Sequence, residues 1–288
     1  MSDADDGQAA GTTTLRPYPK IPASGGTPAP GAREWVAAEK VHGAHFAVVC
    51  DAAGTRPAKR RELLGDDDLD AFFGVSRIWP ALAVAADRFA ATLRAAGRRH
   101  QGGRAGGATD TTPVAAITLY GELAGGRYPH PDVPAEPGVD PVQTGVWYAP
   151  GLHWLLFDAV VDTSGGRLWI SDRVLRTVAA GVGLPCAPLL GRGPRHRLDD
   201  LPTAFPTRVP ALLRLPELDG NLAEGYVLKP AGEWREDAED ASVVRPLVKV
   251  KQQAFAEDRR YSGGRADQPP PQGAPGVRPR RGREPATR

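Results

Sequence analysis

The sequence has few cysteines, few lysines and no long apolar run. Its 288 residues include two cysteines, and no stretch of 18 consecutive residues is apolar. A membrane-spanning helix needs about 20 predominantly apolar residues, so we expect no membrane segment. Residues 1–6 are acidic and lack an apolar core, so we expect no secretory signal peptide. We therefore expect a cytoplasmic protein in which Cys50 and Cys186 are buried free thiols; a disulfide between them is the alternative.

The scarcity of lysine is informative because the chain is rich in arginine. Of the 36 basic residues only six are lysine, and the other 30 are arginine. Lysine can lose its proton and act as a nucleophile, or place a compact charge on a phosphate, and arginine is a poor substitute in both roles. We therefore expect the remaining lysines to mark chemistry. They are Lys20, Lys40, Lys59, Lys229, Lys249 and Lys251.

The pattern of apolar residues predicts a mixed fold. The expected strands lie at residues 35–38, 46–50, 114–119, 144–148, 154–161, 187–190, 224–228 and 247–251. Helices are expected over residues 79–97 and 171–180, and a broken helical stretch over residues 198–213. Strands and helices do not alternate regularly, which favours an α+β fold built on antiparallel sheets.

Composition separates the two ends of the chain from the rest. We expect one folded domain over residues 15–258, a disordered N-terminus over residues 1–14 and a disordered tail over residues 259–288. The tail is rich in Pro and Gly and holds eight arginines against two acidic residues, a net charge of +6. Such a composition buries too little apolar surface to become ordered. It could attract phosphate backbones without reading sequence; a solvated terminus is the alternative.

Three short segments combine reactive residues with glycine or arginine. In Glu-Lys-Val-His-Gly at residues 39–43, a lysine in a tight turn between strands suits a nucleophile; a surface hairpin lysine is the alternative. In Lys-Arg-Arg at residues 59–61, a guanidinium could hold a phosphate with two hydrogen bonds, or be solvated. In Tyr-Gly-Glu-Leu-Ala-Gly-Gly at residues 120–126, a carboxylate at a strand end could bind a ribose hydroxyl or a metal, or belong to an ordinary turn.

Two later segments complete the set. Phe157 and Asp158 place an aromatic ring beside a carboxylate, which could stack on a purine or form ordinary strand core. The fifth segment pairs residues 224–229 with residues 247–251. Side chains alternate along a strand, so Lys249 and Lys251 should share one face, as should Glu224, Tyr226 and Leu228. Two ammonium groups on one face suit an anion such as a triphosphate; a solvated edge strand is the alternative.

In this order the segments resemble the covalent nucleotidyltransferase superfamily of DNA ligases, RNA ligases and messenger-RNA capping enzymes. They most resemble the RNA ligase 2 family of phage-type and editing ligases, which has Lys-x-His-Gly where most DNA ligases have Lys-x-Asp-Gly. Residues 18–21, Tyr-Pro-Lys-Ile, resemble that family's opening strand. The resemblance covers roughly residues 16–257 and implies the ligase adenylation fold, two antiparallel sheets flanked by helices.

The resemblance also implies an activity. The implied activity is that of an ATP-dependent RNA ligase of RNA repair that uses Mg²⁺. Such an enzyme would move AMP from ATP to Lys40 and then to an RNA 5′-phosphate. It would finally seal that end to a 3′-hydroxyl. The implied roles are phosphate contact for Arg60, ribose binding for Glu122, stacking on adenine for Phe157, metal placement for Glu224, phosphate binding and catalysis for Lys249 and Lys251, and further nucleotide contacts for Glu39, His42 and Gly43.

The sequence departs from the family at two points. His45 stands where the family commonly has Asn, which affects one phosphate or ribose contact, and we expect no second domain after Glu257 to dock RNA. A DNA-joining or capping-type enzyme, a non-catalytic RNA-binding relative and an unrelated nucleotide-dependent carrier stay open as alternatives. The residues do not indicate the physiological RNA, a choice between nicks and free ends, or an oligomeric state.

Overall fold

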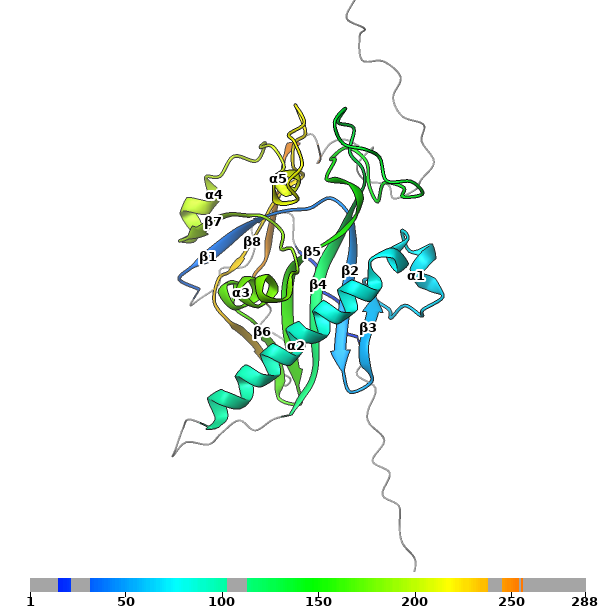
Figure 1. Ribbon diagram of the computed structural model, residues 1–288. Helices are drawn as coiled ribbons and strands as arrows, with labels where there is room; N and C mark the ends of the chain where they lie inside the picture. The colour runs from blue at the N-terminus through cyan, green and yellow to red at the C-terminus, as the bar shows by residue number, and fades with distance from the viewer. Residues whose placement is uncertain (1–14, 22–31, 103–112, 238–244, 254, 256–288) are drawn as a thin grey trace, which may run out of the picture.

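Two antiparallel sheets form the framework of the protein, seen in the computed structural model of Figure 1. The structure describes residues 15–21, 32–102, 113–237, 245–253 and 255. The larger sheet comprises, in spatial order, β3 (Gly54–Ala58), β2 (Ala44–Asp51), β4 (Val114–Arg127), β5 (Ala149–Thr163), β6 (Gly166–Trp169) and β9 (Trp234–Asp237). The smaller sheet comprises β10 (Val248–Lys251), β8 (Gly225–Pro230), β1 (Trp35–Glu39) and β7 (Leu189–Gly193). The prediction of an α+β fold of two antiparallel sheets is confirmed.

Two longer helices cover the larger sheet. Helix α2 (Trp79–Gly102) runs across its strands, and α3 (Asp172–Val182) packs beside α2 and on β5 (Figure 1). The core between them is apolar, and its fully buried members include Phe46, Phe89, Ile117, Leu119 and Leu156. The short helices are α1 (Asp68–Ala71), the 3₁₀ helix η1 (Val75–Arg77), α4 (Arg195–Asp199) and α5 (Val209–Leu212).

Helix α3 begins and ends where its capping residues predict. The Ser171 hydroxyl accepts a hydrogen bond from the Val174 N–H at 3.4 Å, which satisfies one free donor of the first turn. Gly183 follows the last turn with φ 76°, a left-handed conformation that glycine adopts without a steric cost. The prediction of a capped helix at this place is confirmed.

The strand expected over residues 144–148 does not form. Instead, the Asn221 side chain takes the place of a neighbouring strand: Trp147 donates its N–H to Asn221 Oδ1 at 2.9 Å, and Asn221 Nδ2 donates to the Trp147 carbonyl at 2.7 Å. The apolar side chains of this stretch are nevertheless buried, as the pattern of residues predicts, because Val146 and Tyr148 pack in a small cluster. This part of the prediction is therefore wrong about the backbone and right about burial.

Strand β4 is longer than predicted and changes the position of Glu122. We expected the strand to end at residue 119 with Glu122 just beyond it, but β4 continues to Arg127. The strand passes through irregularities of register near Gly121 and Gly125. At Gly121 a side chain would clash, since a Cβ there would lie 2.2 Å from the Trp154 ring. Glycines that sequence reasoning assigned to a turn therefore lie inside a strand, and Glu122 lies opposite His45 on β2.

Three short strands were not predicted. Strands β3, β6 and β9 have four or five residues each, and β3 contains Gly54 and Pro57, which normally argue against a strand. Proline is tolerated there because β3 lies at the edge of the sheet. Both cysteines are free thiols, as expected. None of the helices in the described ranges is long and apolar enough to cross a membrane.

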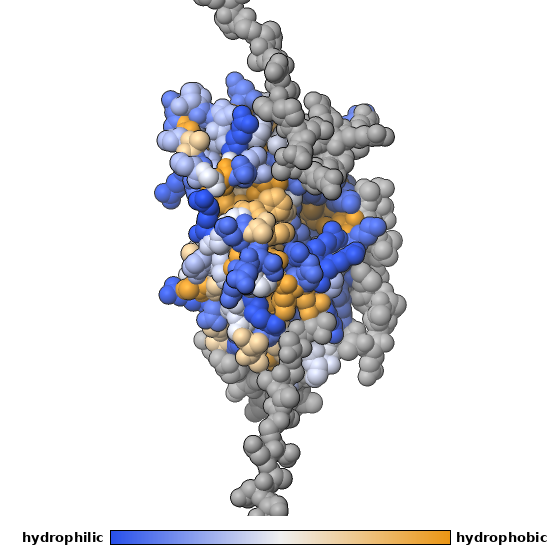
Figure 2. Space-filling model, turned by 90° about the vertical axis from the view of Figure 1, so that its right-hand side faces the viewer, coloured by the Kyte–Doolittle hydropathy of each residue, from blue (hydrophilic) through white to orange (hydrophobic). Residues whose placement is uncertain are grey.

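The two sheets meet where β1 leads directly into β2 through residues 40–43. The N-terminal residues 15–21 lie against this junction without forming a strand, and Tyr18 among them is buried. On the face shown in Figure 2, apolar residues occur in separate groups among hydrophilic ones. The expectations for residues 1–14 and for the basic tail over residues 259–288 lie outside the described residues.

Candidate active site

The turn that carries Lys40 is held by the smaller sheet on one side and by the segment before β5 on the other. The Lys40 N–H donates to the Gly225 carbonyl at 2.9 Å, and the His42 N–H donates to the Tyr148 hydroxyl at 2.8 Å. Gly43 cannot be replaced without a clash, because a Cβ there would lie 1.9 Å from the Leu123 carbonyl oxygen. The sequence Lys-x-His-Gly therefore produces a turn whose backbone contacts fix the base of the Lys40 side chain.

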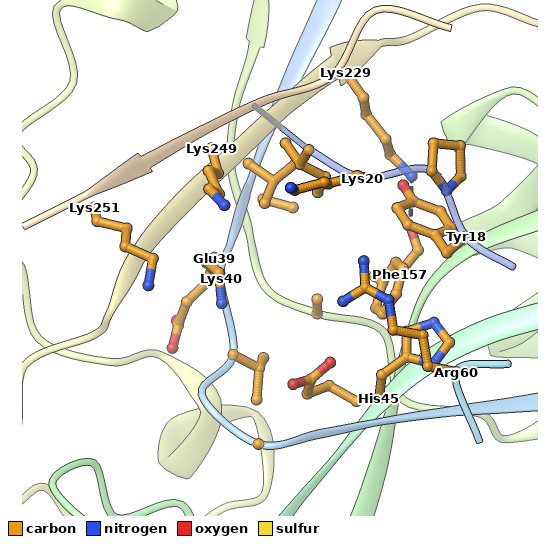
Figure 3. Close-up of a pocket in the computed structure, with 18 residues that line it drawn as sticks. Tyr18, Lys20, Glu39, Lys40, His45, Arg60, Phe157, Lys229, Lys249 and Lys251 are labelled. Atoms are coloured by element: carbon orange, nitrogen blue, oxygen red, sulfur yellow. Dashed lines mark hydrogen bonds between the residues drawn. The ribbon is translucent and has the colours of Figure 1, made fainter. Parts of the chain in front are cut away.

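Lys40 opens into a cavity of about 440 Å³ between the two sheets, drawn in Figure 3. Five of the six lysines line it, and the sixth, Lys59, is exposed and pairs with Glu62 at 2.5 Å. The lysines of the cavity are Lys20, Lys40, Lys229, Lys249 and Lys251. The lysines that were predicted to mark chemistry therefore lie, with one exception, at a single site. Arg60, Glu122, Phe157 and Gly43, which the sequence also predicted for this site, line the same cavity.

Glu224 binds the amines of two lysines. Its carboxylate accepts from Lys40 Nζ at 2.5 Å and pairs with Lys251 Nζ at 2.6 Å, and His42 Nδ1 lies 3.4 Å from it. Burial alone would raise the pKa of Glu224, but the hydrogen bond from His42, the charge of Lys40 and the hydrogen bond from Lys251 outweigh burial and hold that pKa at about 2. Glu224 therefore stays ionised at neutral pH.

The orientation of Glu224 differs from the expectation of strand alternation. Tyr226 and Leu228 pack into an apolar cluster with Trp35 on the far face of β8, whereas the Glu224 carboxylate meets Lys40 and Lys251. Glu224 precedes the strand, and Gly225 after it has φ 142°, which turns the chain. The expectation that these three side chains share a face is wrong for Glu224, whereas Lys249 and Lys251 do border one cavity as predicted.

Two of the residues predicted to contact the nucleotide have other contacts. The Glu39 carboxylate accepts from the Thr207 hydroxyl and from the Arg208 N–H, so both of its oxygens are engaged at the start of α5. Burial raises the pKa of Glu39 to about 7, although these hydrogen bonds act in the opposite direction. The His42 ring lies against Phe255 and beside Glu224. Glu39 borders the cavity but its carboxylate supports the turn, and His42 orients Glu224.

His45 and Glu122 face one another across β2 and β4. Burial raises the pKa of Glu122 to about 7, against the lowering effect of the Lys40 charge. Burial and the nearby Arg60 charge lower the pKa of His45 to about 4, so its imidazole is neutral. Within the described part of the chain, neither ring nitrogen of His45 has a hydrogen-bond partner. This edge of the cavity therefore offers a carboxyl group and a neutral imidazole to a bound molecule.

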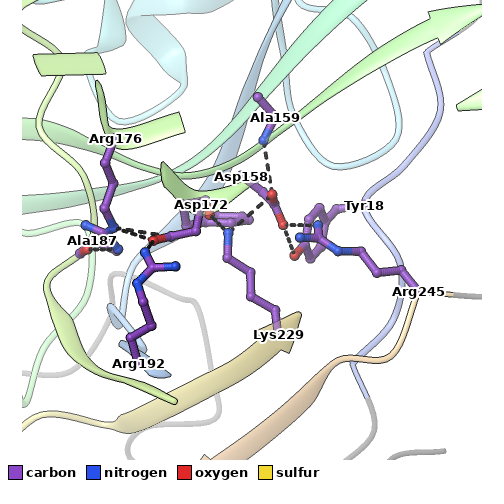
Figure 4. Close-up of polar contacts among 10 residues, drawn as sticks. Tyr18, Asp158, Ala159, Asp172, Arg176, Ala187, Arg192, Lys229 and Arg245 are labelled. Carbon is purple, nitrogen blue, oxygen red and sulfur yellow. Dashed lines mark hydrogen bonds and ion pairs between the residues drawn. The ribbon is translucent and has the colours of Figure 1, made fainter. Parts of the chain in front are cut away.

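An aromatic wall and a buried ionic network form the other edge. Phe157 on β5 meets Tyr18 edge to face with ring centroids 5.1 Å apart, and both line the cavity. Behind them Asp158 accepts from the Tyr18 hydroxyl at 2.9 Å and pairs with Arg245 at 2.5 Å and Lys229 at 3.2 Å (Figure 4). Burial would raise the pKa of Asp158, but Arg245 and Lys229 outweigh it and lower that pKa. The network holds the wall in place.

Sequence reasoning assigned no role to three of these residues. Tyr18 was noted only as part of an opening segment, Lys20 only in that segment and among the scarce lysines, and Arg245 lay outside every segment. The scarcity of lysine singled out Lys20 and Lys229 but gave neither of them a role. No comparable signal exists for Arg245, because arginine is the common basic residue of this chain and its partner Asp158 lies 87 positions away.

The arrangement suits a nucleotide. Cations gather around one cavity, an aromatic ring can stack on a base, and carboxyl groups are available for a ribose. Within the described ranges no three His, Cys, Asp or Glu side chains lie together as a ready-made metal site. Magnesium usually needs only one or two carboxylates, since water and phosphate oxygens supply its other ligands. Glu122 and Glu224 provide that number, so the residues fit a magnesium–nucleotide complex.

Comparison with known proteins decides the family. A family model described as RNA ligase matches residues 33–251. The chain belongs to the RNA ligase family. The match begins after Tyr18 and Lys20 and ends on Lys251, so it contains the Lys40 turn, Glu122, Phe157 and both lysines of β10.

The RNA ligase family includes curated relatives of moderate identity. RNA-editing ligase 2 of Trypanosoma brucei brucei, a mitochondrial protein, is 29% identical over 216 residues, which cover 68% of this chain and 48% of the relative. RNA-editing ligase 1 of the same organism is 29% identical over 258 residues, which cover 78% of this chain and 50% of the relative. The chain thus spans about half the length of the curated relatives that it matches.

Solved structures of RNA ligases also align with this one. A variant of the Naegleria gruberi RNA ligase with ATP and Mn aligns at 12% identity and a TM-score of 0.43, covering 80% of this chain and 53% of that one. An archaeal ATP-dependent RNA ligase aligns at 17% identity and a TM-score of 0.42, covering 82% of this chain and 48% of that one. The family assignment rests on the sequence match and not on these alignments.

Proposed function

We propose that this protein is an ATP-dependent RNA ligase that forms a covalent AMP intermediate on Lys40. The observation that carries the proposal is the position of Lys40: a member of the RNA ligase family places this lysine in the turn that joins the two sheets, at a cavity that four further lysines line. Its substrates would be ATP and RNA with 5′-phosphate and 3′-hydroxyl ends.

In the first step the Lys40 amine attacks the α-phosphorus of ATP. A phosphorus–nitrogen bond forms, the bond between the α-phosphorus and the bridging oxygen breaks, and pyrophosphate leaves. The AMP would then pass to an RNA 5′-phosphate, and a 3′-hydroxyl would displace it. Such transfers are accelerated mainly by positioning the reactants and by neutralising charge on phosphate.

Glu224 would orient the Lys40 amine but would not take its proton. Its carboxylate lies 2.5 Å from Lys40 Nζ, which fixes where the amine points. A group with a pKa of about 2 is too weak a base to remove a proton from an ammonium group at neutral pH. The proton of Lys40 would therefore leave to solvent or to the bound phosphate as ATP enters.

The other side chains of the cavity would divide the nucleotide between them. Phe157 would stack on the base, Glu122 would bind the ribose, and the cationic groups of Arg60, Lys249 and Lys251 would neutralise phosphate charge. Magnesium, held by Glu224 together with water and phosphate oxygens, would add further charge neutralisation when bound.

The proposal is tested by incubating the protein with α-labelled ATP and magnesium and measuring label on the denatured protein. The wild type should carry label, and Lys40→Ala and Lys40→Arg should not, because arginine keeps the charge but provides no neutral amine. Lys59→Ala is the matched control, since Lys59 lies outside the cavity. Label on the Lys40→Arg protein at the wild-type level would refute the assignment. Labelled nicked RNA and nicked DNA duplexes then separate an RNA ligase from a DNA-joining enzyme.

A further inference from the structure

The five lysines of the cavity differ in their partners. Lys40 and Lys251 both pair with Glu224, and Lys229 pairs with Asp158. Among the residues that the structure describes, neither Lys20 nor Lys249 forms an ion pair with a carboxylate. These two lysines therefore bring positive charge to the cavity that no directly paired carboxylate of the described residues offsets, and the charge of Glu224 acts on Lys249 only from further away.

Lys20 and Lys249 come from different parts of the chain and point into the same space. In Figure 3 their amines extend toward each other from the N-terminal segment and from β10. Burial lowers the pKa of Lys249, and the charges of Lys251, Lys40 and Lys20 lower it further, against the raising effect of the Glu224 charge. Lys20 is therefore near enough to Lys249 for its charge to lower the pKa of the Lys249 ammonium group.

The segment that carries Lys20 is fixed in place. The Tyr18 hydroxyl donates to Asp158 at 2.9 Å, and the Tyr120 hydroxyl donates to the Arg16 carbonyl at 2.9 Å. Tyr18 is buried among Tyr120, Phe157 and Trp169. The backbone two residues before Lys20 is therefore anchored beside the cavity, and the exposed Lys20 side chain extends from this anchor.

Like charges held near one another cost Coulomb energy unless an anion lies between them. Glu224 already offsets Lys40 and Lys251, so the anion that suits Lys20 and Lys249 is one that extends beyond the group bound at Lys40. A polyphosphate has this property, because it carries several charges in a chain and binds compact ammonium groups as point charges.

We propose that Lys20 is a further phosphate-binding residue, which with Lys249 holds the pyrophosphate portion of ATP. The inference rests on the proposed function, since it takes Lys40 as the group that attacks the α-phosphorus. When the bond between the α-phosphorus and the bridging oxygen breaks, the electron pair stays on pyrophosphate, and the two ammonium groups stabilise the added charge. Lys20 exchanges no proton in this step.

The proposal separates the first step from the later ones. Pyrophosphate takes part only in the formation of the lysyl-AMP and in its reversal, and neither transfer of AMP to RNA nor the final sealing involves it. A substitution of Lys20 should therefore impair the reaction with ATP and spare a reaction that begins from RNA already carrying AMP at its 5′ end.

The experiment compares Lys20→Met with Lys59→Met, which removes the one lysine outside the cavity. Three quantities are measured: the kcat/KM for labelling by α-labelled ATP, the rate at which pyrophosphate removes label from the purified protein–AMP, and the rate of sealing of pre-adenylated RNA without ATP. Lys20→Met should lower the first two by about tenfold to a hundredfold, the value of one hydrogen bond to a charged group, and leave the third within about twofold of wild type. Lys59→Met should change none of them.

Two results would overturn the inference while the proposed function stands. One is that Lys20→Met is labelled by ATP, and loses its label to added pyrophosphate, at the wild-type rates. The other is an equal loss of sealing of pre-adenylated RNA, which would place Lys20 at the RNA or in the stability of the fold. Absence of label on the wild-type protein would instead overturn the proposed function. Lys20→Arg should recover part of the labelling rate, because it restores charge with a different geometry.

Discussion

Replacing Glu224 by glutamine should destabilise the folded protein. The carboxylate is 2% exposed and offsets the ammonium groups of Lys40, at 2.5 Å, and of Lys251, at 2.6 Å. Glutamine has nearly the same shape, so the substitution leaves no cavity, but it removes the negative charge. Two ammonium groups then remain close together around a buried side chain, with no described carboxylate between them.

The size of the expected loss of stability follows from the pKa of Glu224. Its ordinary value is 4.5, and in the folded protein it is about 2. A pKa that is depressed on folding contributes stability above the unfolded value and loses it as pH falls through the folded value. The difference corresponds to about 3 kcal/mol of unfolding free energy at pH 7 and to roughly half of that at pH 3.

The assay is urea unfolding of wild type and Glu224→Gln at pH 7 and at pH 3. The difference in unfolding free energy between the two proteins should be about 3 kcal/mol at pH 7 and should be smaller at pH 3. Glu62→Gln is the control, because Glu62 forms an exposed pair with Lys59, and it should leave the urea midpoint unchanged. A gap below about 1 kcal/mol at pH 7, or a gap that does not narrow with falling pH, would show that Glu224 does not stabilise the lysines as the contacts indicate.

Four further predictions follow from the site and from the sequence. Glu122→Gln should lose labelling, yet its stability relative to wild type should rise between pH 5 and pH 8 in thermal unfolding, because the pKa of Glu122 is raised from 4.5 to about 7 and ionisation in this range costs the wild type stability; a constant difference would contradict this. Gly43→Ala should lower the unfolding temperature and abolish labelling, since its Cβ would lie 1.9 Å from the Leu123 carbonyl oxygen, whereas Gly97→Ala, with no atom within 4 Å of the new Cβ, should be neutral or stabilising. ATP should label the protein better than GTP or NAD; equal labelling by GTP would point to a capping-type enzyme. Deleting residues 260–288, which lie outside the described residues, should preserve labelling but weaken RNA joining as salt rises from about 50 to 200 mM, and identical salt profiles would exclude a role for the tail.

The parts of the site that the sequence predicts are those with local signals. The strands on either side of Lys40 follow from alternating apolar residues, and the turn between them follows from Gly43 and its neighbours. The capped helix α3 follows from Ser171 and Gly183 in the same way. In each case the residues that decide the structure lie within a few positions of one another, so the pattern contains the whole signal.

The parts that could not be predicted depend on distant partners. Asn221 replaces a strand partner for Trp147 from 74 positions away, and no residue near Trp147 in the sequence indicates this contact. Asp158 meets Arg245 across 87 positions, in a chain where arginine is too common to stand out. The direction of Glu224 depends on the backbone at Gly225, whose φ of 142° cannot be read from strand alternation. Only the tertiary fold brings these contacts together.

The distribution of lysine makes this protein an unusual target for amine chemistry. Reagents that acylate primary amines normally modify a protein over its whole surface, but here five of the six side-chain amines border one cavity and only Lys59 lies elsewhere. Coupling of a dye or a solid support through lysine would thus modify side chains of the cavity as well as Lys59. The two thiols are poor substitutes as attachment points, since burial raises the pKa of Cys50 and of Cys186 to about 11. Conversely, the protection of the cavity lysines from acylation by nucleotide measures how fully the cavity is occupied, with Lys59 as the reference amine outside it.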